Sequence, residues 1–137
     1  MTETKAMQYI PQAAPFVMID EVTKADDTVS QTIFTVREGH LFVDNGRFTE
    51  PGLVENMAQT AAAGTGYKAR QNGQAAPVGY IGAVKNLVIH ELPQTGDTIT
   101  TEISFIHQVM NAHIVQGRIL KEGREIASCE LKIFLQQ

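Results

Sequence analysis

The 137-residue sequence contains one cysteine, no tryptophan and no apolar run near the roughly 20 residues of a membrane-spanning helix. A single cysteine cannot form an internal disulfide, which excludes a disulfide-stapled scaffold and favours a reducing compartment. The first residues, MTETKAMQYI, lack the hydrophobic region of a signal peptide. We therefore expect a soluble, cytoplasmic protein without a membrane span.

Basic residues are also scarce. The 11 Lys and Arg residues are outnumbered by 15 Asp and Glu residues, and they form no stripe or cluster. This balance argues against nucleic acid as the main partner. The four histidines lack metal-ligand spacing, and the glycines at Gly64 and Gly66 lack the surrounding pattern of a phosphate loop. We expect neither a metal nor a cofactor.

The length and the order of hydrophobic patterns predict one domain over residues 1–137, with a single core. Two strands are expected first, at 16–23 and 28–38, then one helix, then about four strands between residues 78 and 135. Runs of strands with one helix indicate an α+β fold with an antiparallel sheet. Such a sheet, curled around one helix, leaves a face or edge that needs cover, so a dimer is expected.

The helix is predicted from the segment Phe48–Tyr67, FTEPGLVENMAQTAAAGTGY, with Thr49 as N-cap and Pro51 in the first turn. It is expected to end near residues 70–73, where basic residues suit a helix C-terminus. The segment is small or apolar on almost every side, which is typical of a buried helix. Glu55 near its start either complements the helix dipole or forms a site; burial favours the site. Gln59, one turn later, either hydrogen-bonds Glu55 or contacts the sheet or a partner.

Three segments together resemble one family. The opening IPQAAPF with Val-Met-Ile-Asp at 17–20 is similar to L-P-H-x-x-P-F-L-L-V-D, and Glu55–Gln59 (ENMAQ) is similar to E-A-M-A-Q. Residues 79–97, ending in LPQTGD, resemble the strand and P-G-D turn that follow the family's helix. These are motifs of the hotdog-fold (3R)-hydroxyacyl-acyl-carrier-protein dehydratases of fatty acid synthesis. The resemblance covers nearly the whole chain and implies an antiparallel sheet wrapped around one long central helix.

In that family a histidine of the opening motif removes the α-proton of the acyl thioester, and a helix-start acid handles the departing β-hydroxyl. The two residues come from different subunits of a dimer. The resemblance places Glu55 at the acid and Gln12 at the histidine. Since an amide is no general base near neutral pH, Gln12 can only orient the substrate. His40 is the best replacement base, whereas His90, His107 and His113 are expected at the surface.

The expected acyl site combines aromatic side chains with the start of the helix. Phe16 and Phe42 are the candidate wall residues, and the helix-start N–H groups of Gly52, Leu53 and Val54 would polarise the thioester carbonyl. Cys129, in an alternating strand, is expected to be a packed core thiol.

The function hypotheses follow from these residues. The first is a lyase-like dehydratase on 3-hydroxyacyl thioesters carried by acyl carrier protein or coenzyme A, acting as a homodimer or a multiple of dimers. The second is a thioesterase in which Glu55 activates water or attacks the thioester. The third is a non-catalytic acyl or acyl-carrier binding subunit.

Overall fold

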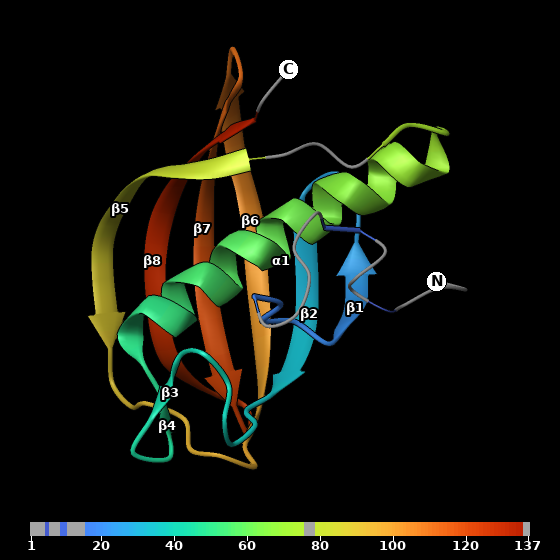
Figure 1. Cartoon of the computed structure of the whole chain (residues 1–137). Coiled ribbons are helices and arrows are strands. Elements are labelled where there is room, and N and C mark those ends of the chain that lie inside the picture. The colour runs from blue at the N-terminus through green and yellow to red at the C-terminus, as the bar shows by residue number, and fades with distance from the viewer. Residues whose placement is uncertain (1–4, 6–8, 11–15, 76–78, 136–137) are drawn as a thin grey trace.

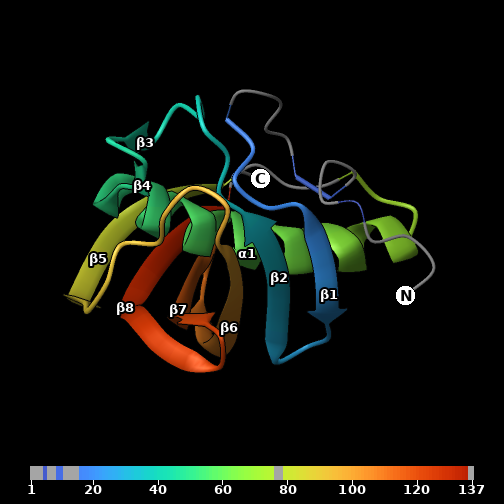
Figure 2. The ribbon, with the colours of Figure 1, turned by 90° about the horizontal axis from the view of Figure 1, so that it is seen from below.

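The computed structural model describes residues 5, 9–10, 16–75 and 79–135. One long helix crosses the concave face of an antiparallel six-stranded sheet in the order β1-β2-β6-β7-β8-β5 (Figures 1 and 2). The elements are β1 (Glu21–Ala25), β2 (Val29–Thr35), β3 (Val43–Asp44), β4 (Arg47–Phe48), α1 (Glu50–Gln71), β5 (Gly79–Ile89), β6 (Thr98–Val109), β7 (Ala112–Lys121) and β8 (Arg124–Leu135). This confirms the predicted hotdog architecture. Within the described residues, no helix is long and apolar enough to cross a membrane.

The core lies between α1 and the sheet because the strands alternate. In β6 the side chains of Ile99, Thr101 and Ile103 are buried beneath the helix while their neighbours are more exposed. Small helix residues let the other elements approach. A Cβ atom at Gly64 would lie 2.8 Å from the Cβ of Ser30 on β2, so the glycine sets the helix–sheet spacing here.

The first strand was predicted over too long a segment. Extended structure was expected at residues 16–23, but β1 begins only at Glu21. Met18 bonds to helix side chains instead of to a strand: its N–H donates to Gln59, and its carbonyl accepts from Asn56. Pairing with β2 starts at Asp20, whose N–H donates to the Ile33 carbonyl. At Met18, tertiary partners therefore replace the ladder that the apolar pattern suggested.

The connection between β2 and α1 contains the short β3–β4 hairpin. Its turn has positive φ at Asn45 (52°) and Gly46 (74°), the conformation that Asn-Gly favours in a two-residue hairpin turn. The hairpin lies beside the start of α1 (Figure 1), where Thr49 N–H and Oγ1 both donate to the Phe42 carbonyl. Thr49 is the N-cap residue, as predicted, but its hydroxyl holds the hairpin instead of capping the helix.

Candidate functional site

Glu55 lies in the second turn of α1 and lines two cavities. One, the Phe16 cavity, measures about 430 Å³ and is lined by Phe16, Met18, Phe42, Pro51, Glu55 and Gln59. The other, the β5 cavity, measures about 260 Å³ and is lined by Glu55, Ala58, Ala62, Gly79, Tyr80, Ile81, Ile133 and Leu135. Among these described lining residues, Glu55 has the only charged side chain. The site therefore offers one carboxyl group between two mainly apolar spaces.

The environment of Glu55 changes its proton affinity. Partial burial raises the pKa of this carboxyl above its ordinary value, and the Gln59 side-chain amide partly offsets that effect. The rise means that burial outweighs the stabilisation of the charged form by hydrogen bonding. A carboxyl with a raised pKa retains its proton to higher pH, which suits it to donate a proton.

Gln59 also builds the wall of the Phe16 cavity. Its Oε1 accepts the Met18 N–H at 2.7 Å, and its Nε2 donates to the Phe16 carbonyl at 2.7 Å. These two bonds hold the chain at residues 16–18 beside Glu55. Gln59 also acts on the Glu55 carboxyl, whose pKa its hydrogen bond lowers. Its contacts with residues 16 and 18 are to the segment before β1 and not to the sheet.

Asn56 is a supporting residue that the sequence reasoning missed. Its side chain is fully buried, donates from Nδ2 to the Met18 carbonyl at 2.7 Å, and accepts from the Thr101 hydroxyl at 2.5 Å. The signal was an Asn directly after Glu55 in an otherwise small and apolar helix, since a buried amide requires partners. Asn56 thereby ties the Phe16 cavity wall to β6 through the helix.

His40 supports the site without lining either cavity. The Phe42 N–H donates to its Nδ1 at 3.2 Å, which leaves Nε2 to donate its proton to the Val17 carbonyl at 3.2 Å. With both ring nitrogens engaged, His40 has no free lone pair directed at a substrate. Its position points to holding Phe42, a residue of the Phe16 cavity, in place.

The remaining predicted residues fall into different places. Gln12 lies outside the described residues. At the helix start, a Cβ at Gly52 would lie 2.6 Å from the Phe48 ring, so glycine permits close packing there. Leu53 is buried in the core and its N–H donates to the Thr49 carbonyl at 3.0 Å. Val54 packs against the same core.

The other histidines and the cysteine can now be placed. His90 and His107 are exposed, as expected, but His113 is half-buried in β7, where it pairs with Gln108 of β6. Desolvation and the nearby Lys68 lower the pKa of His113. Cys129 is buried, with a pKa raised by burial to about 11, which confirms a core thiol.

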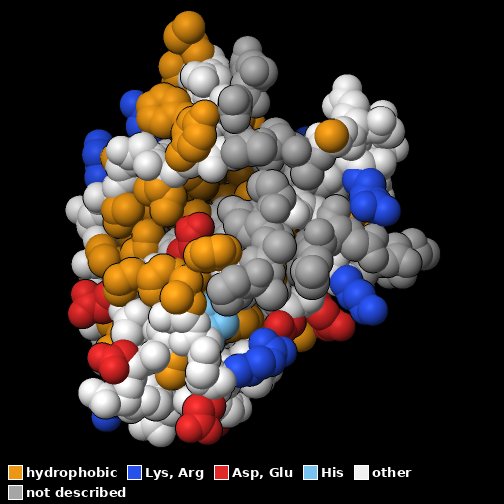
Figure 3. Space-filling model, viewed as in Figure 1, with side chains coloured by type: hydrophobic (Ala, Val, Ile, Leu, Met, Phe, Trp, Pro, Cys, Tyr) orange, Lys and Arg blue, Asp and Glu red, His pale blue; other side chains and the backbone are white. Residues whose placement is uncertain are grey.

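Strand β5 forms one edge of the sheet and is exposed along most of its length. Tyr80, Ile81, Val84, Leu87 and Val88 are all large apolar side chains with 36% or more of their surface exposed. Hydrophobic side chains gather on the side of the molecule formed by β5 and the beginning of α1 (Figure 3). The β5 cavity, with Glu55 in it, opens along this same edge.

Comparison with known proteins assigns the chain to a family. The model of the ApeP-like family, described as ApeP dehydratase, matches residues 4–137. The chain belongs to this family. A comparison with curated protein sequences finds no match.

Solved structures resemble this ApeP-like chain in fold. The dehydratase heterocomplex ApeI:P from Xenorhabdus doucetiae superposes with a TM-score of 0.91 at 18% identity, over 98% of this chain and 93% of that chain. A hypothetical thioesterase with coenzyme A from Streptococcus pneumoniae TIGR4 gives 0.68 at 14% identity, covering 85% and 87%. The protein smu.793 from Streptococcus mutans UA159, bound to acetyl CoA, gives 0.70 at 10% identity, covering 93% and 96%. At these identities the similarity shows the fold alone.

Proposed function

We propose that this ApeP-like chain is the acid-bearing subunit of a 3-hydroxyacyl-thioester dehydratase, with Glu55 as the proton donor. The observation that carries the proposal is a carboxyl group of raised pKa set between two apolar cavities. An acyl thioester needs apolar space for its chain and a proton for its leaving hydroxyl. The substrate is carried by acyl carrier protein or coenzyme A; coenzyme A and acetyl CoA occupy the two hotdog neighbours named above.

The reaction requires one base and one acid. A base takes the α-proton, the C–H electron pair forms the double bond, and the β-carbon–oxygen bond breaks. Glu55 gives its proton to the departing hydroxyl, which leaves as water. The products are the 2-enoyl thioester and water, so the step needs no oxidant, reductant or metal. A positioned acid of this kind typically contributes about 10²–10⁴-fold to the rate.

The base is the partner subunit's contribution in this proposal. Gln12 stands at the family's histidine position and cannot accept the proton. His40 uses both ring nitrogens in hydrogen bonds to the backbone, and His113 lies outside both Glu55 cavities. The heterocomplex relative pairs two different dehydratase chains, which provides a precedent for a partner that completes the site.

The β5 edge is the surface on which such a partner would sit. Its exposed apolar side chains and unpaired strand edge suit a second hotdog chain better than water. Because Tyr80 and Ile81 also line the β5 cavity, the partner would close the cavity that contains Glu55. Val84→Glu, in the middle of this edge, should yield monomers by sedimentation and lose activity. Lys85→Glu is the control, because it changes the charge of the neighbouring position without removing an apolar contact.

The experiment follows 3-hydroxyacyl and 2-enoyl thioesters, on carrier protein and on coenzyme A, by mass spectrometry. Wild type alone should interconvert them slowly. Gln12→His should increase the rate by about 10²-fold or more, because it restores a base. The double variant Gln12→His with Glu55→Gln should lose that gain. Gln12→Asn is the matched control, since it changes the residue without adding a base. An inert Gln12→His variant that also binds no acyl thioester would overturn the proposal.

A thioesterase remains the second candidate because Glu55 is a carboxylate in a family of thioester-binding folds. It would release free thiol without forming an enoyl product. The sign of the pH dependence separates the two. A dehydratase acid must be protonated, so its activity falls as pH rises through the raised pKa, whereas a thioesterase base or nucleophile must be ionised and loses activity as pH falls.

A further inference from the structure

A cluster of ion pairs joins two turns at the end of the sheet where the β3–β4 hairpin lies (Figure 1). The side chain of Lys121, the last residue of β7, is only 17% exposed, and its Nζ lies 2.9 Å from Asp97 Oδ2 and 3.1 Å from Glu91 Oε2. Arg124, at the start of β8, pairs with the same Glu91. Isolated surface ion pairs contribute little, but this cluster has a shielded central cation and links four side chains. It therefore has the geometry to hold the segment between β5 and β6 in place.

Asp97 connects this cluster to a turn. Its Oδ2 accepts the Gln94 N–H at 2.8 Å as well as the Lys121 ammonium, and its own N–H donates to the Gln94 carbonyl at 2.9 Å. The hydrogen bond from Lys121 is the largest cause of the lowered pKa of Asp97, and the bond to Asp97 is the largest cause of the raised pKa of Lys121. Both groups are therefore charged at neutral pH. One carboxylate thus closes the turn at residues 94–97 and ties it to β7.

The same segment carries the β3–β4 hairpin. Strand β4 is bonded to β3 on one side and to residues 93–95 on the other. The Phe48 N–H donates to the Pro93 carbonyl at 2.8 Å, and the Thr95 N–H donates to the Gly46 carbonyl at 2.9 Å. Because a hairpin of two-residue strands is marginally stable by itself, its position depends on this support.

The hairpin reaches the Glu55 site through Phe42. The Phe42 carbonyl accepts from the hydroxyl of Thr49 at the start of α1, and the Phe42 side chain lines the Phe16 cavity together with Glu55. We propose that Lys121 and Asp97 are positioning residues of this site: their ion pair fixes the turn that carries the hairpin, and the hairpin holds Phe42 against the cavity. The inference rests on the proposed function in treating this cavity as part of the acyl site. It adds two residues that line neither of the Glu55 cavities.

Two variants remove the ion pair and leave the turn in place. Asp97→Asn keeps an oxygen that can accept the Gln94 N–H, and Lys121→Met keeps an aliphatic side chain without the charge. Amide hydrogen exchange followed by NMR then reports on the two bonds that join hairpin and turn, donated by Phe48 and Thr95. Relative to amides in the middle of the β7–β8 pair, both variants should speed these two exchanges by about 5-fold, the upper end for an ion pair near the surface. The double variant should show less than the product of the two single effects, because both remove the same bond.

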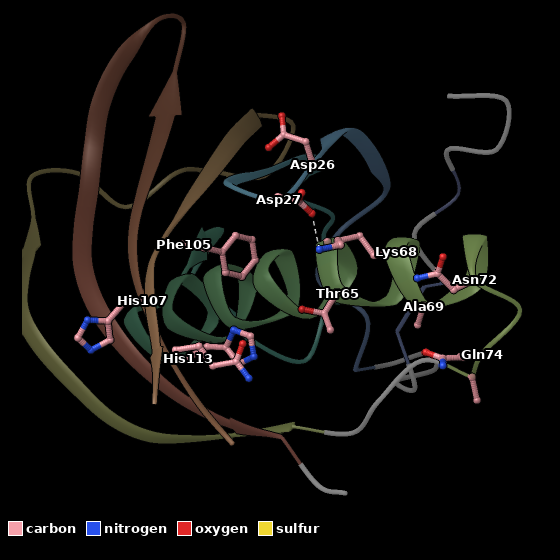
Figure 4. A pocket seen from close by; sticks show the side chains of 13 residues that line it. Asp26, Asp27, Thr65, Lys68, Ala69, Asn72, Gln74, Phe105, His107 and His113 are labelled. Carbon is pink, nitrogen blue, oxygen red and sulfur yellow. Dashed lines mark ion pairs between the residues drawn. The ribbon is translucent and has the colours of Figure 1, made fainter. Parts of the chain in front are cut away.

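Two other ion pairs provide the controls. Arg118 lies on the same strand as Lys121 but pairs with Glu102 of β6, at 3.1 Å. Lys68, in the last turn of α1, pairs with Asp27 beside an open space (Figure 4), so Lys68→Met removes a lysine from the same helix as the site acid. Arg118→Met and Lys68→Met should leave the two exchanges unchanged.

The titration of Glu55 shows whether the effect reaches the site. Its carboxyl carbon is followed by NMR across pH in each variant. When Phe42 is held less firmly, water reaches the carboxyl more easily, so the raised pKa of Glu55 should fall in both ion-pair variants. A direct charge effect would have opposite signs, because losing the Asp97 anion lowers the pKa of Glu55 and losing the Lys121 cation raises it.

Three outcomes would overturn the proposal: unchanged exchange in both variants, faster exchange with an unchanged Glu55 titration, or pKa shifts of opposite sign. Activity is a separate readout. If wild type dehydrates 3-hydroxyacyl thioesters, kcat/KM should fall about 5-fold in both ion-pair variants and stay unchanged in Arg118→Met. If wild type shows no dehydration, the proposed function has failed, while exchange and titration still decide the role of the ion pair. Far-ultraviolet circular dichroism and thermal melts check that each variant is folded.

Discussion

Replacing Asn56 by Ala should destabilise the protein strongly, because its uncharged side chain is fully buried and hydrogen-bonded at both ends. Its side chain is the single link between the Met18 carbonyl and the Thr101 hydroxyl, at 2.7 Å and 2.5 Å. Truncation leaves both partners inside the protein without this amide. Because water cannot reach them freely, each loses a hydrogen bond that the unfolded chain would make with solvent.

The magnitude follows from the two orphaned groups. A buried polar group without a partner costs about 1–3 kcal/mol, so the variant should lose roughly 2–6 kcal/mol of unfolding free energy. Domains of this kind are stable by only about 5–15 kcal/mol. With a urea m-value of about 1–3 kcal/mol per molar, the unfolding midpoint should fall by roughly 1 M or more.

The assay is urea denaturation followed by circular dichroism, in a double-mutant cycle with Thr101→Val. Each single variant should be destabilised, and the double variant should cost less than the two together by about 0.5–3 kcal/mol, because both remove the same bond. Thr100→Val, on the neighbouring half-exposed position of β6, is the matched control and should change stability by less than about 0.5 kcal/mol. A loss below about 1 kcal/mol for Asn56→Ala, or full additivity in the cycle, would refute the reasoning.

Three further outcomes are expected. Burial raises the folded-state pKa of Glu55 above its ordinary value of 4.5. The carboxyl therefore contributes stability below pH 4.5, and this contribution is lost as pH rises. Glu55→Gln should melt at a higher temperature than wild type at neutral pH but not at about pH 4. Ion pairs hold the pKa of Glu91 at about 2. The contribution of Glu91 to folding stability is therefore complete above pH 4.5 and is lost as pH falls toward 2. Glu91→Gln should make the melting temperature fall less steeply over this acidic range. Gly66→Ala would place a Cβ 1.9 Å from the Tyr9 carbonyl oxygen, so it should cost about 1–3 kcal/mol in urea denaturation despite the better helix propensity of Ala; an unchanged midpoint would contradict this packing.

The helix and most strands were predictable because their signals are local. Pro51 in the first turn and the small, uncharged run after it placed α1, which ends at Gln71, close to the expected end. Alternation placed β6 and β8. The segment at 16–18 was assigned wrongly because its apolar pattern fits a strand, while Phe16 and Met18 bond to Gln59 and Asn56, some forty residues away along the chain.

Parts of the candidate site were predictable and others were not. The helix pattern alone identified Glu55, and the structure brings Phe16, Phe42 and Gln59 to the same cavity. The half-burial of His113 could not be predicted, because it depends on how far the β6–β7 hairpin extends and on what packs over it. The His113 ring lies edge-to-face with that of Phe105, a contact that exists only once β6 and β7 pair in this register.

By itself the sequence determined most of the helix and strand segments and that one acid lies near the start of the helix. These properties depend on neighbours along the chain: turn residues, hydrophobic period and side-chain chemistry. Only the tertiary structure decided that Glu55 faces two cavities and that burial raises its pKa. Burial and cavities arise between segments far apart in sequence, and the sheet must curl around the helix before either exists.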